Sequence, residues 1–215
     1  MQSRPWYLSV TAIWSYANSG YEGMKAEFDK YLNRIPFSHK VVPESFRHFT
    51  VLPLIRITKW PVEETGEDIA LNYLSEFRNI MEACEKQFNK IMVKPLEVKS
   101  YDSGTTIQFE SVDNSVSLLR EEMKNIFNEL IVNIANDNPN IYSEIEHENA
   151  KNTGNITYGS ISRSYSNEGH ALRWRMPIPN DQIIEFNKVF LLASDQFLSN
   201  PAAHNEKDRL EITLV

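Results

Sequence analysis

The sequence predicts a protein of the α+β class, in which antiparallel strands are flanked by helices. Three observations predict it: two long amphipathic helical segments, strand-like alternation before and after each of them, and a hairpin turn signal between them. Strict alternation of single strands and helices, as in a doubly wound sheet, is not seen. No linker interrupts the 215 residues, so we expect one domain over residues 1–215.

The first half of the chain predicts strand, helix, strand and helix. Residues 6–14 are aromatic and β-branched with polar alternation, which is typical of a strand. Apolar residues four apart predict a helix over 21–35, and a second strand follows over 46–57, where Pro53 indicates an edge position or a bulge. The most regular helical pattern covers 66–91. Its apolar stripe consists of Ala70, Leu74, Phe77, Met81, Cys84, Phe88 and Ile91.

The second half begins with a hairpin and a helix. Strands are predicted over 92–99 and 105–110, joined by the turn Asp102-Ser103-Gly104. A helix over 115–134 is capped by Asp113 or Asn114. Residues 135–154 have little periodicity and predict an irregular loop. Further strands are predicted over 155–162, 172–176, 188–194 and 209–215, with a helical turn near Asn180.

Composition and charge exclude several functional classes. A net charge of −7 and a pI near 5.3 argue against binding to long duplex nucleic acid, which depends on cations that contact phosphates. A small nucleotide or an RNA terminus remains compatible with this charge. The single cysteine, Cys84, excludes an intrachain disulfide and a Cys-based zinc site. No apolar run is long enough for a membrane span and no signal peptide is recognisable, so we expect a cytoplasmic protein with no membrane partner.

One predicted strand carries a polar pair. His48 and Thr50 are two residues apart, so they share a face of the strand. A histidine beside a hydroxyl on a rigid strand suits a phosphate or acyl site, and a structural histidine is the alternative. A similar triplet, Asn155-Ile156-Thr157, follows about a hundred residues later. Its alternation puts Asn155, Thr157 and Gly159 on one face and Ile156, Tyr158 and Ser160 on the other.

In the order and spacing of its elements, the chain resembles the 2H phosphoesterases, which include the bacterial RNA 2′,3′-cyclic phosphodiesterases once called 2′-5′ RNA ligases. His48-Phe49-Thr50-Val51 resembles the first His-x-Thr/Ser motif of this family, and Asn155-Ile156-Thr157-Tyr158-Gly159 resembles the second. The strand from Thr105 to Glu110, followed by Leu118-Leu119, also falls where the family has one. The resemblance covers most of the chain. It implies a two-lobed fold whose antiparallel sheets and helices surround a central cleft.

The resemblance also implies a metal-independent phosphodiesterase without a cofactor. One motif histidine acts as general base, the other protonates the leaving oxygen, and the two hydroxyls hold the phosphate. This chain departs from the pattern because Asn155 replaces the second histidine and an amide transfers no proton at neutral pH. The loss of one such partner typically costs about 10²–10⁴-fold in rate. The arginine that often follows the second motif is also displaced, since position 160 is Ser160 and Arg163 lies three residues on.

Three alternatives follow from this departure. His48 acts alone on a substrate with a good leaving group, or His147 or His170 enters the cleft, or the protein binds its ligand without turnover. The expected ligand is a small phosphodiester: a cyclic nucleotide, a 2′-5′ linkage or an RNA 2′,3′-cyclic phosphate. We expect His48 to transfer the proton, Thr50 and Thr157 to bind the phosphate, and Asn155 to donate a hydrogen bond. The candidate substrate-binding residues are Tyr7, Tyr158, Arg163, His170 and Arg173.

Other candidates have simpler interpretations. Glu144, Glu146, His147 and Glu148 lack metal-ligand spacing and predict a solvated loop, so no metal site is expected. We expect a monomer. A plain interaction protein remains an alternative, and it predicts that His48 and Thr50 are buried and satisfied by neighbours. The phosphodiesterase hypothesis predicts instead that they line an open cleft together with Thr157.

Overall fold

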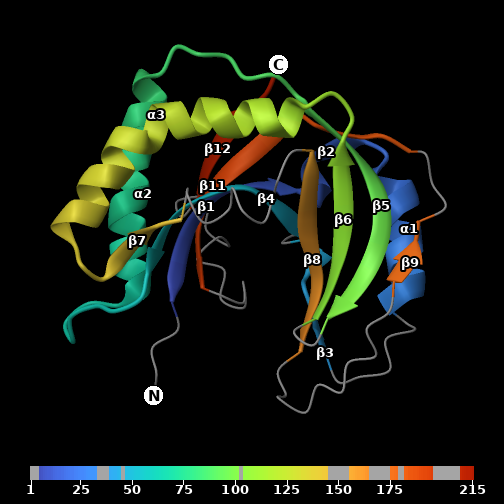
Figure 1. Ribbon diagram of the computed structural model, residues 1–215, viewed down its shortest axis with the longest axis horizontal. Coiled ribbons are helices and arrows are strands. Elements are labelled where there is room, and N and C mark those ends of the chain that lie inside the picture. Colours follow the sequence, from blue (N-terminus) through green and yellow to red (C-terminus); the bar gives the residue numbers. More distant parts are fainter. Residues whose placement is uncertain are drawn as a thin grey trace.

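The computed structural model is shown in Figure 1. The residues that it describes are 5–32, 39–44, 47–101, 104–144, 155–164, 175–178, 182–195 and 209–215. Its strands are β1 (Trp6–Ile13), β2 (Ala17–Ser19), β3 (His39–Val41), β4 (His48–Ile57), β5 (Ile91–Tyr101), β6 (Gly104–Ser111), β7 (Ile141–Ser143), β8 (Ile156–Ser164), β9 (Arg175–Pro177), β10 (Ile184–Phe186), β11 (Lys188–Asp195) and β12 (Arg209–Thr213). Its helices are the 3₁₀ helix η1 (Trp14–Tyr16), α1 (Tyr21–Leu32), α2 (Gly66–Ala83) and α3 (Ser115–Asp137).

The described strands form one sheet in the order β12-β11-β1-β4-β8-β6-β5-β10-β2. β3, β7 and β9 extend it beside β8, β4 and β5, and all these pairings are antiparallel. The sheet curls into two arms: the first arm contains β1, β4, β7, β11 and β12, and the second contains β5, β6, β8, β9 and β10 (Figure 1). The predicted α+β class with an antiparallel sheet is confirmed.

The main apolar core lies on one face of this sheet, and a smaller apolar cluster of Ile13, Val42, Phe190 and Leu192 lies on the other. In the first arm, alternate β1 residues such as Leu8 and Val10 are fully buried and belong to the same core cluster as the stripes of α2 and α3. Phe77 of α2 and Phe127 of α3 meet edge to face, with ring centroids 5.0 Å apart. In the second arm the corresponding face holds an aromatic cluster, in which Phe109 lies 5.6 Å from Phe49 between ring centroids. We call this the core face and the opposite face the inner face.

The two arms meet where β4 pairs with β8 at Phe49 and Gly159. β7 joins the same edge of β4 only from Ile55 onward, so between these points β4 has no strand partner on that edge within the described residues. Other groups bind the carbonyls there: Arg120 Nε of α3 donates to the Val51 oxygen at 2.6 Å. The register of β1 against β4 shifts twice on this stretch, which confirms the bulge that Pro53 indicated.

Helix α2 is shorter than predicted. It starts with a capping box, in which Thr65 Oγ1 accepts from the Asp68 backbone and the Asp68 carboxylate accepts from the Thr65 backbone. It ends at Ala83 rather than at residue 91, and the backbone of the next residue, Cys84, is extended. Apolar residues continue at helical spacing beyond this end, but they pack outside the helix: Phe88 pairs with Leu214, and Ile91 begins β5. The helical prediction for residues 84–91 is therefore wrong.

The remaining differences concern element ends and short strands. α3 extends to Asp137, and of its two candidate caps Asp113 accepts from the Ser115 backbone N–H, whereas Asn114 forms no side-chain cap. The predicted loop after this helix contains β7. β10 was not predicted, and the helical turn near Asn180 lies outside the described residues. Within the described part of the chain, every helix is too short or too polar to cross a membrane.

Candidate functional site

Strand β4 places His48 and Thr50 on the inner face. Phe49 between them is fully buried in the aromatic cluster, so its two neighbours point the other way. On β1, Ile13 pairs with His48 and Thr11 pairs with Thr50. The sequence prediction that these two side chains share a face agrees with this register. His48 is only 7% exposed and already takes part in an interaction within the chain, as the interaction-protein alternative predicts, whereas Thr50 is half-buried.

The second triplet faces the opposite way. Thr157 pairs with Phe109, is 1% exposed, and its Oγ1 donates to the Thr50 carbonyl at 3.4 Å. A Cβ at Gly159 would lie 2.7 Å from the Trp14 ring, so this side of β8 is packed against the core. Thr157 therefore does not line a cleft with His48 and Thr50, contrary to the expectation. A strand has a side-chain period of two, so an error of one residue moves the whole set to the other face.

Asn155 is also remote from His48. It precedes β8, and its carbonyl accepts from the Ser111 backbone at 2.7 Å near the end of β6. Gly159, the residue of β8 that pairs with β4, lies four residues further on, about 13 Å along an extended strand. The structure does not bring the Asn155 amide to the position of a second motif histidine.

Tyr158 is the residue of this triplet region that shares the inner face with Thr50. It pairs with Gln108 on β6, and continuation of the Phe49–Gly159 register by one residue places it opposite Thr50. Its side chain is 36% exposed, and the ammonium of Lys99 lies 5.7 Å from the ring centroid. Tyr158 therefore presents an accessible aromatic ring beside the His48–Thr50 pair.

Cross-strand neighbours on the inner face form two rows. One row runs from Thr50 through Tyr158 and Gln108 to Glu97. The adjacent row starts at His48, crosses β8 at position 160, and continues through Thr106 to Lys99. The pairs Thr106–Ser160 and Lys99–Thr106 define it. In such rows directly opposed side chains are neighbours, so these residues form one polar surface.

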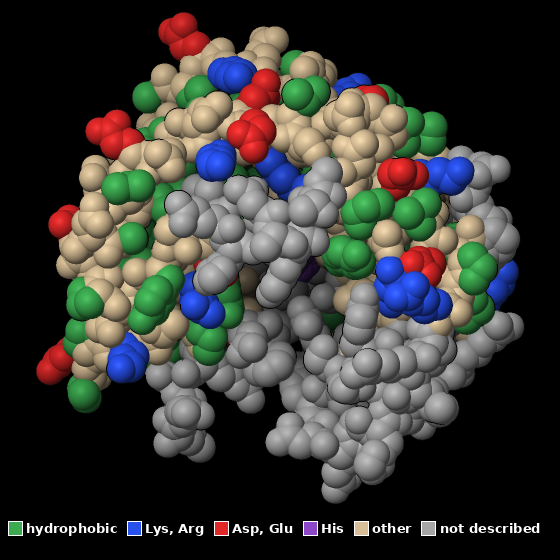
Figure 2. All heavy atoms as spheres, viewed as in Figure 1, with side chains coloured by type: hydrophobic (Ala, Val, Ile, Leu, Met, Phe, Trp, Pro, Cys, Tyr) green, Lys and Arg blue, Asp and Glu red, His purple; other side chains and the backbone are tan. Residues whose placement is uncertain are grey.

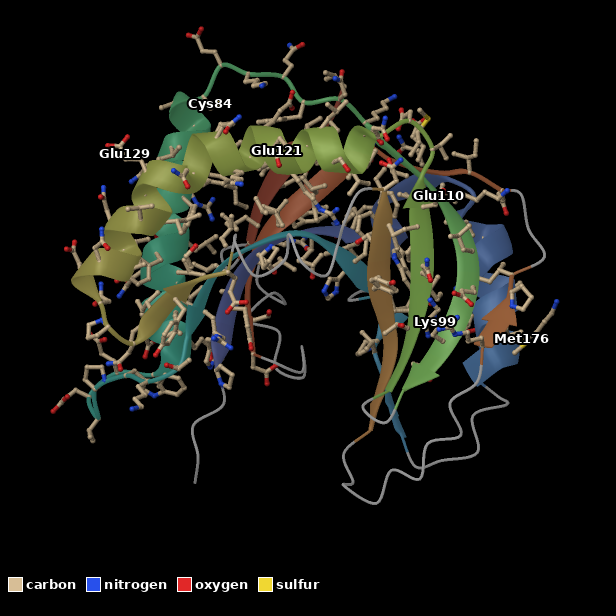
Figure 3. All side chains as sticks on the ribbon, in the orientation of Figure 1. Cys84, Lys99, Glu110, Glu121, Glu129 and Met176 are labelled. Carbon is tan, nitrogen blue, oxygen red and sulfur yellow. The ribbon has the colours of Figure 1, made fainter. Side chains whose placement is uncertain are left out.

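Lys99 and Thr106 differ in their hydrogen-bond partners. The Lys99 ammonium lies 2.6 Å from the Glu97 carboxylate and donates to the Gln108 carbonyl. Figure 3 shows Lys99 on the β5–β6 hairpin of the second arm. The Thr106 hydroxyl oxygen is buried and has no hydrogen-bond partner among the described residues. Figure 2 shows basic and acidic side chains next to one another over this hairpin, so the surface has mixed charge.

Tyr7 belongs to a separate cluster. It pairs with Arg56 on β4, and Arg56 Nε lies 2.9 Å from the Glu144 carboxylate, as an ion pair that is not in line for a hydrogen bond. The Arg56 guanidinium also covers the Tyr142 ring at 5.3 Å. Burial raises the pKa of Tyr7, and the neighbouring Arg56 partly opposes this shift. Tyr7 lies six residues along β1 from Ile13, about 20 Å from the His48 row.

Of the remaining candidates His147, Arg163, His170 and Arg173, only Arg163 lies among the described residues. Arg163 lies on β8, where its backbone pairs with Gly104 and Lys40. His147, His170 and Arg173 lie outside the described residues. Among the residues that are described, no group of three or more His, Cys, Asp or Glu could hold a metal ion.

Two cavities lie away from the predicted site. The larger, of about 350 Å³, is between the start of α2 and the end of α3, and includes Tyr73 and Asn138. The Asn138 amide donates to the Tyr73 hydroxyl at 2.9 Å, and burial raises the pKa of Tyr73. The second, of about 300 Å³, adjoins Ser115 at the start of α3. Neither cavity is lined by a residue that the sequence predicted to be functional.

Sequence reasoning missed Thr106, Gln108 and Lys99. The alternation of β6 contained a signal, since Thr105, Ile107 and Phe109 are buried while Thr106 and Gln108 are half-buried. That pattern identifies a polar face but not the strand that lies beside it. Only the pairing of β6 with β8 shows that this face continues to His48.

Comparison with known proteins adds little to the geometry. No protein-family model matches the sequence. No curated protein matches it either. Among solved structures, the crystal structure of TT0787 of Thermus thermophilus aligns with 97% of this chain and 95% of its own, at 15% identity and a TM-score of 0.48. A likeness of this degree carries no information about function.

Proposed function

We propose that this chain is a 2H-phosphoesterase-like protein whose two-lobed sheet binds a small phosphodiester on its inner face. The observation that supports this best is the position of His48 and Thr50, which lie side by side on the inner face next to the exposed ring of Tyr158. An imidazole and a hydroxyl are suitable donors to phosphate oxygens, and an aromatic ring suits an unpaired base. The proposed ligands are a cyclic nucleotide, a 2′-5′-linked dinucleotide or an RNA 2′,3′-cyclic end.

Binding without efficient turnover is the function that this geometry favours. Displacement at phosphorus in the 2H mechanism needs one group to accept a proton and another to donate one on the opposite side. Asn155 lies near the end of β6 and Thr157 is buried in the core, so neither supplies the second group. The protein then acts as a sensor or a sequestering partner for a small nucleotide or an RNA terminus, as a monomer and without a metal.

Metal-independent phosphodiesterase activity is the second candidate. It is favoured by the common face of His48 and Thr50, two residues apart on β4, which resembles an intact first motif. A single histidine suffices for a substrate whose leaving oxygen needs little protonation, such as a strained cyclic phosphate. In this case His48 acts as the general base and Thr50 holds the phosphate.

Calorimetry on a panel of 2′,3′-cyclic nucleotides, 2′-5′ dinucleotides and cyclic dinucleotides tests the binding proposal. We expect micromolar-range binding that falls by about tenfold or more in Thr50→Ala, because a hydrogen bond to a charged group is lost. His48→Asn tests the imidazole while it keeps a polar side chain of similar size. Absence of binding for the whole panel would overturn the proposal.

The same panel, assayed for hydrolysis with EDTA present, separates the two candidates. Turnover that survives EDTA and is abolished in His48→Asn supports the phosphodiesterase. Binding without turnover supports the sensor. If turnover is present but unchanged in His48→Asn, then the reaction does not use the site proposed here.

A further inference from the structure

We propose that Thr106 and Lys99, on the β5–β6 hairpin, are the anion ligands that face His48 across β8. They take the part that the sequence pattern assigned to Thr157 and Asn155. This inference rests on the proposed function, because it names further ligands of the same site.

The position of these residues follows from the register of three neighbouring strands. His48 lies on β4, β8 crosses next to it, and Thr106 lies on β6 directly beyond β8. Adjacent strands are about 4.8 Å apart, so Thr106 is about 10 Å from His48 between backbones and Lys99 about 14 Å. A phosphate above β8 would therefore lie between His48 on one side and the hairpin residues on the other.

The Thr106 hydroxyl is an unexplained polar group. Its oxygen is buried and lacks a hydrogen-bond partner among the described residues. A buried hydroxyl without a partner destabilises a fold, and valine would fill the same volume in a strand without this penalty. Rotation of this half-buried side chain would turn the hydroxyl toward an anion oxygen that accepts from it, which accounts for the presence of threonine at this position.

Lys99 supplies the charge. It is 9% exposed, and its ammonium is held by the Glu97 carboxylate and the Gln108 carbonyl. An ammonium has three N–H donors and these contacts use two, so one donor remains for a phosphate oxygen. The negative charge of the Glu97 carboxylate neutralises Lys99 and also repels a phosphate bound there. The Glu97–Lys99 pair therefore sets the affinity of the site.

A matched pair of isosteric variants tests the hydroxyl. Thr106→Val removes it from the inner face, whereas Thr105→Val makes the same change on the core face, where Thr105 is 2% exposed. The probes are inorganic phosphate and a 2′,3′-cyclic nucleotide, measured by calorimetry and by the shift of the unfolding temperature. We expect Thr106→Val to weaken both by about tenfold and to unfold at a higher temperature than the wild type, and Thr105→Val to bind normally.

Two charge variants test whether Lys99 and Glu97 act on the bound anion through their charge rather than only stabilise the hairpin. Lys99→Gln should weaken binding of both probes by about tenfold and reduce its dependence on salt. Glu97→Gln should strengthen binding by about three- to tenfold, because it removes a repelling carboxylate and releases the ammonium. If Glu97→Gln and Lys99→Gln both weaken binding, the pair is structural and the inference is overturned.

The outcomes separate this inference from the proposed function. If the cyclic nucleotide binds equally to wild type and Thr106→Val, the hairpin residues are not ligands, while the proposed function stands. If phosphate binds and is lost in Thr106→Val but no phosphodiester binds, the anion site stands and the proposed function falls. If neither probe binds the wild-type protein, both are overturned.

Discussion

Substitution of Gly159 by alanine tests which face of β8 is turned toward the core. Gly159 is the residue that joins the two arms through its pair with Phe49. An added Cβ would lie 2.7 Å from Trp14 Cζ2 and 3.1 Å from both Phe109 Cε2 and the His48 carbonyl oxygen. Its backbone is outside the left-handed region, so the effect of alanine is steric and not conformational.

The size of the effect follows from how rigid these neighbours are. Carbon atoms in contact are normally about 3.5–4.0 Å apart, so the ring of Trp14 would have to move by almost 1 Å. Trp14 is fully buried and packs edge to face on Phe109, with ring centroids 5.7 Å apart. Overpacking of a site of this kind costs about 1–3 kcal/mol. For a domain of this length, about 2 kcal/mol lowers the unfolding temperature by about 4–8 °C.

Thermal unfolding followed by circular dichroism measures this change, with Tyr158→Phe as a control on the other face of the same strand. The control should unfold within about 1 °C of the wild type, because only an exposed hydroxyl is removed. If the sequence-predicted orientation were right, Gly159 would face the cleft and alanine would stabilise the strand by about 0.5–1 kcal/mol. A Gly159→Ala protein at least as stable as the wild type would therefore refute the orientation described here.

Three further predictions concern the core face, the edge of β4 and the start of α2. Thr157→Val should change ligand affinity by less than about twofold in calorimetry and stability by less than about 1 kcal/mol, since its hydroxyl makes one long bond to a carbonyl; a large loss of binding would restore Thr157 as a ligand. Arg120→Met should cost about 1–3 kcal/mol in urea unfolding because the Val51 carbonyl loses its 2.6 Å donor, and an unchanged midpoint would contradict this. Thr65→Ala should lower the unfolding temperature at pH 7, because the capping box is lost. The bonds from Thr65 hold the pKa of Asp68 below its usual value, so this contribution is present above the ordinary carboxyl pKa and is lost as the pH falls through the lowered one. The difference between Thr65→Ala and wild type should thus shrink below about pH 4, and a constant difference would exclude the carboxylate.

The strands and helices whose apolar pattern has one clear period were predictable from the sequence. The limits of α2 were not, because Phe88 and Ile91 continue the helical period. Their conformation is decided by distant partners: the Val215 backbone donates to the Phe88 carbonyl at 2.8 Å. Propensity and periodicity are local quantities and do not contain this information.

In the candidate site, too, the features set by local spacing were predictable and those set by distant partners were not. The common face of His48 and Thr50 follows from their spacing within one strand. The orientation of β8 does not, since Ile156 and Tyr158 look like the apolar face, yet Thr157 and Gly159 are the buried residues. The aromatic rings of Trp14 and Phe109 decide this, because only glycine leaves room for them at position 159. The partners Thr106 and Lys99 were likewise invisible, because register between strands is a property of the assembled sheet.

Helix α3 contacts both arms of the sheet. Among the described residues, the strands of the two arms pair directly at one joint only, Phe49 with Gly159. The helix crosses this joint: Ser115 at its start accepts from the Met92 backbone in the second arm, and Asn138 at its end donates to Tyr73 in the first. Its 23 residues amount to about 35 Å of helix, and the helix bends along its course (Figure 1). The position of the two arms relative to each other thus depends on a helix that packs on their core face, and a change in the course of α3 would alter the inner face without touching any residue on it.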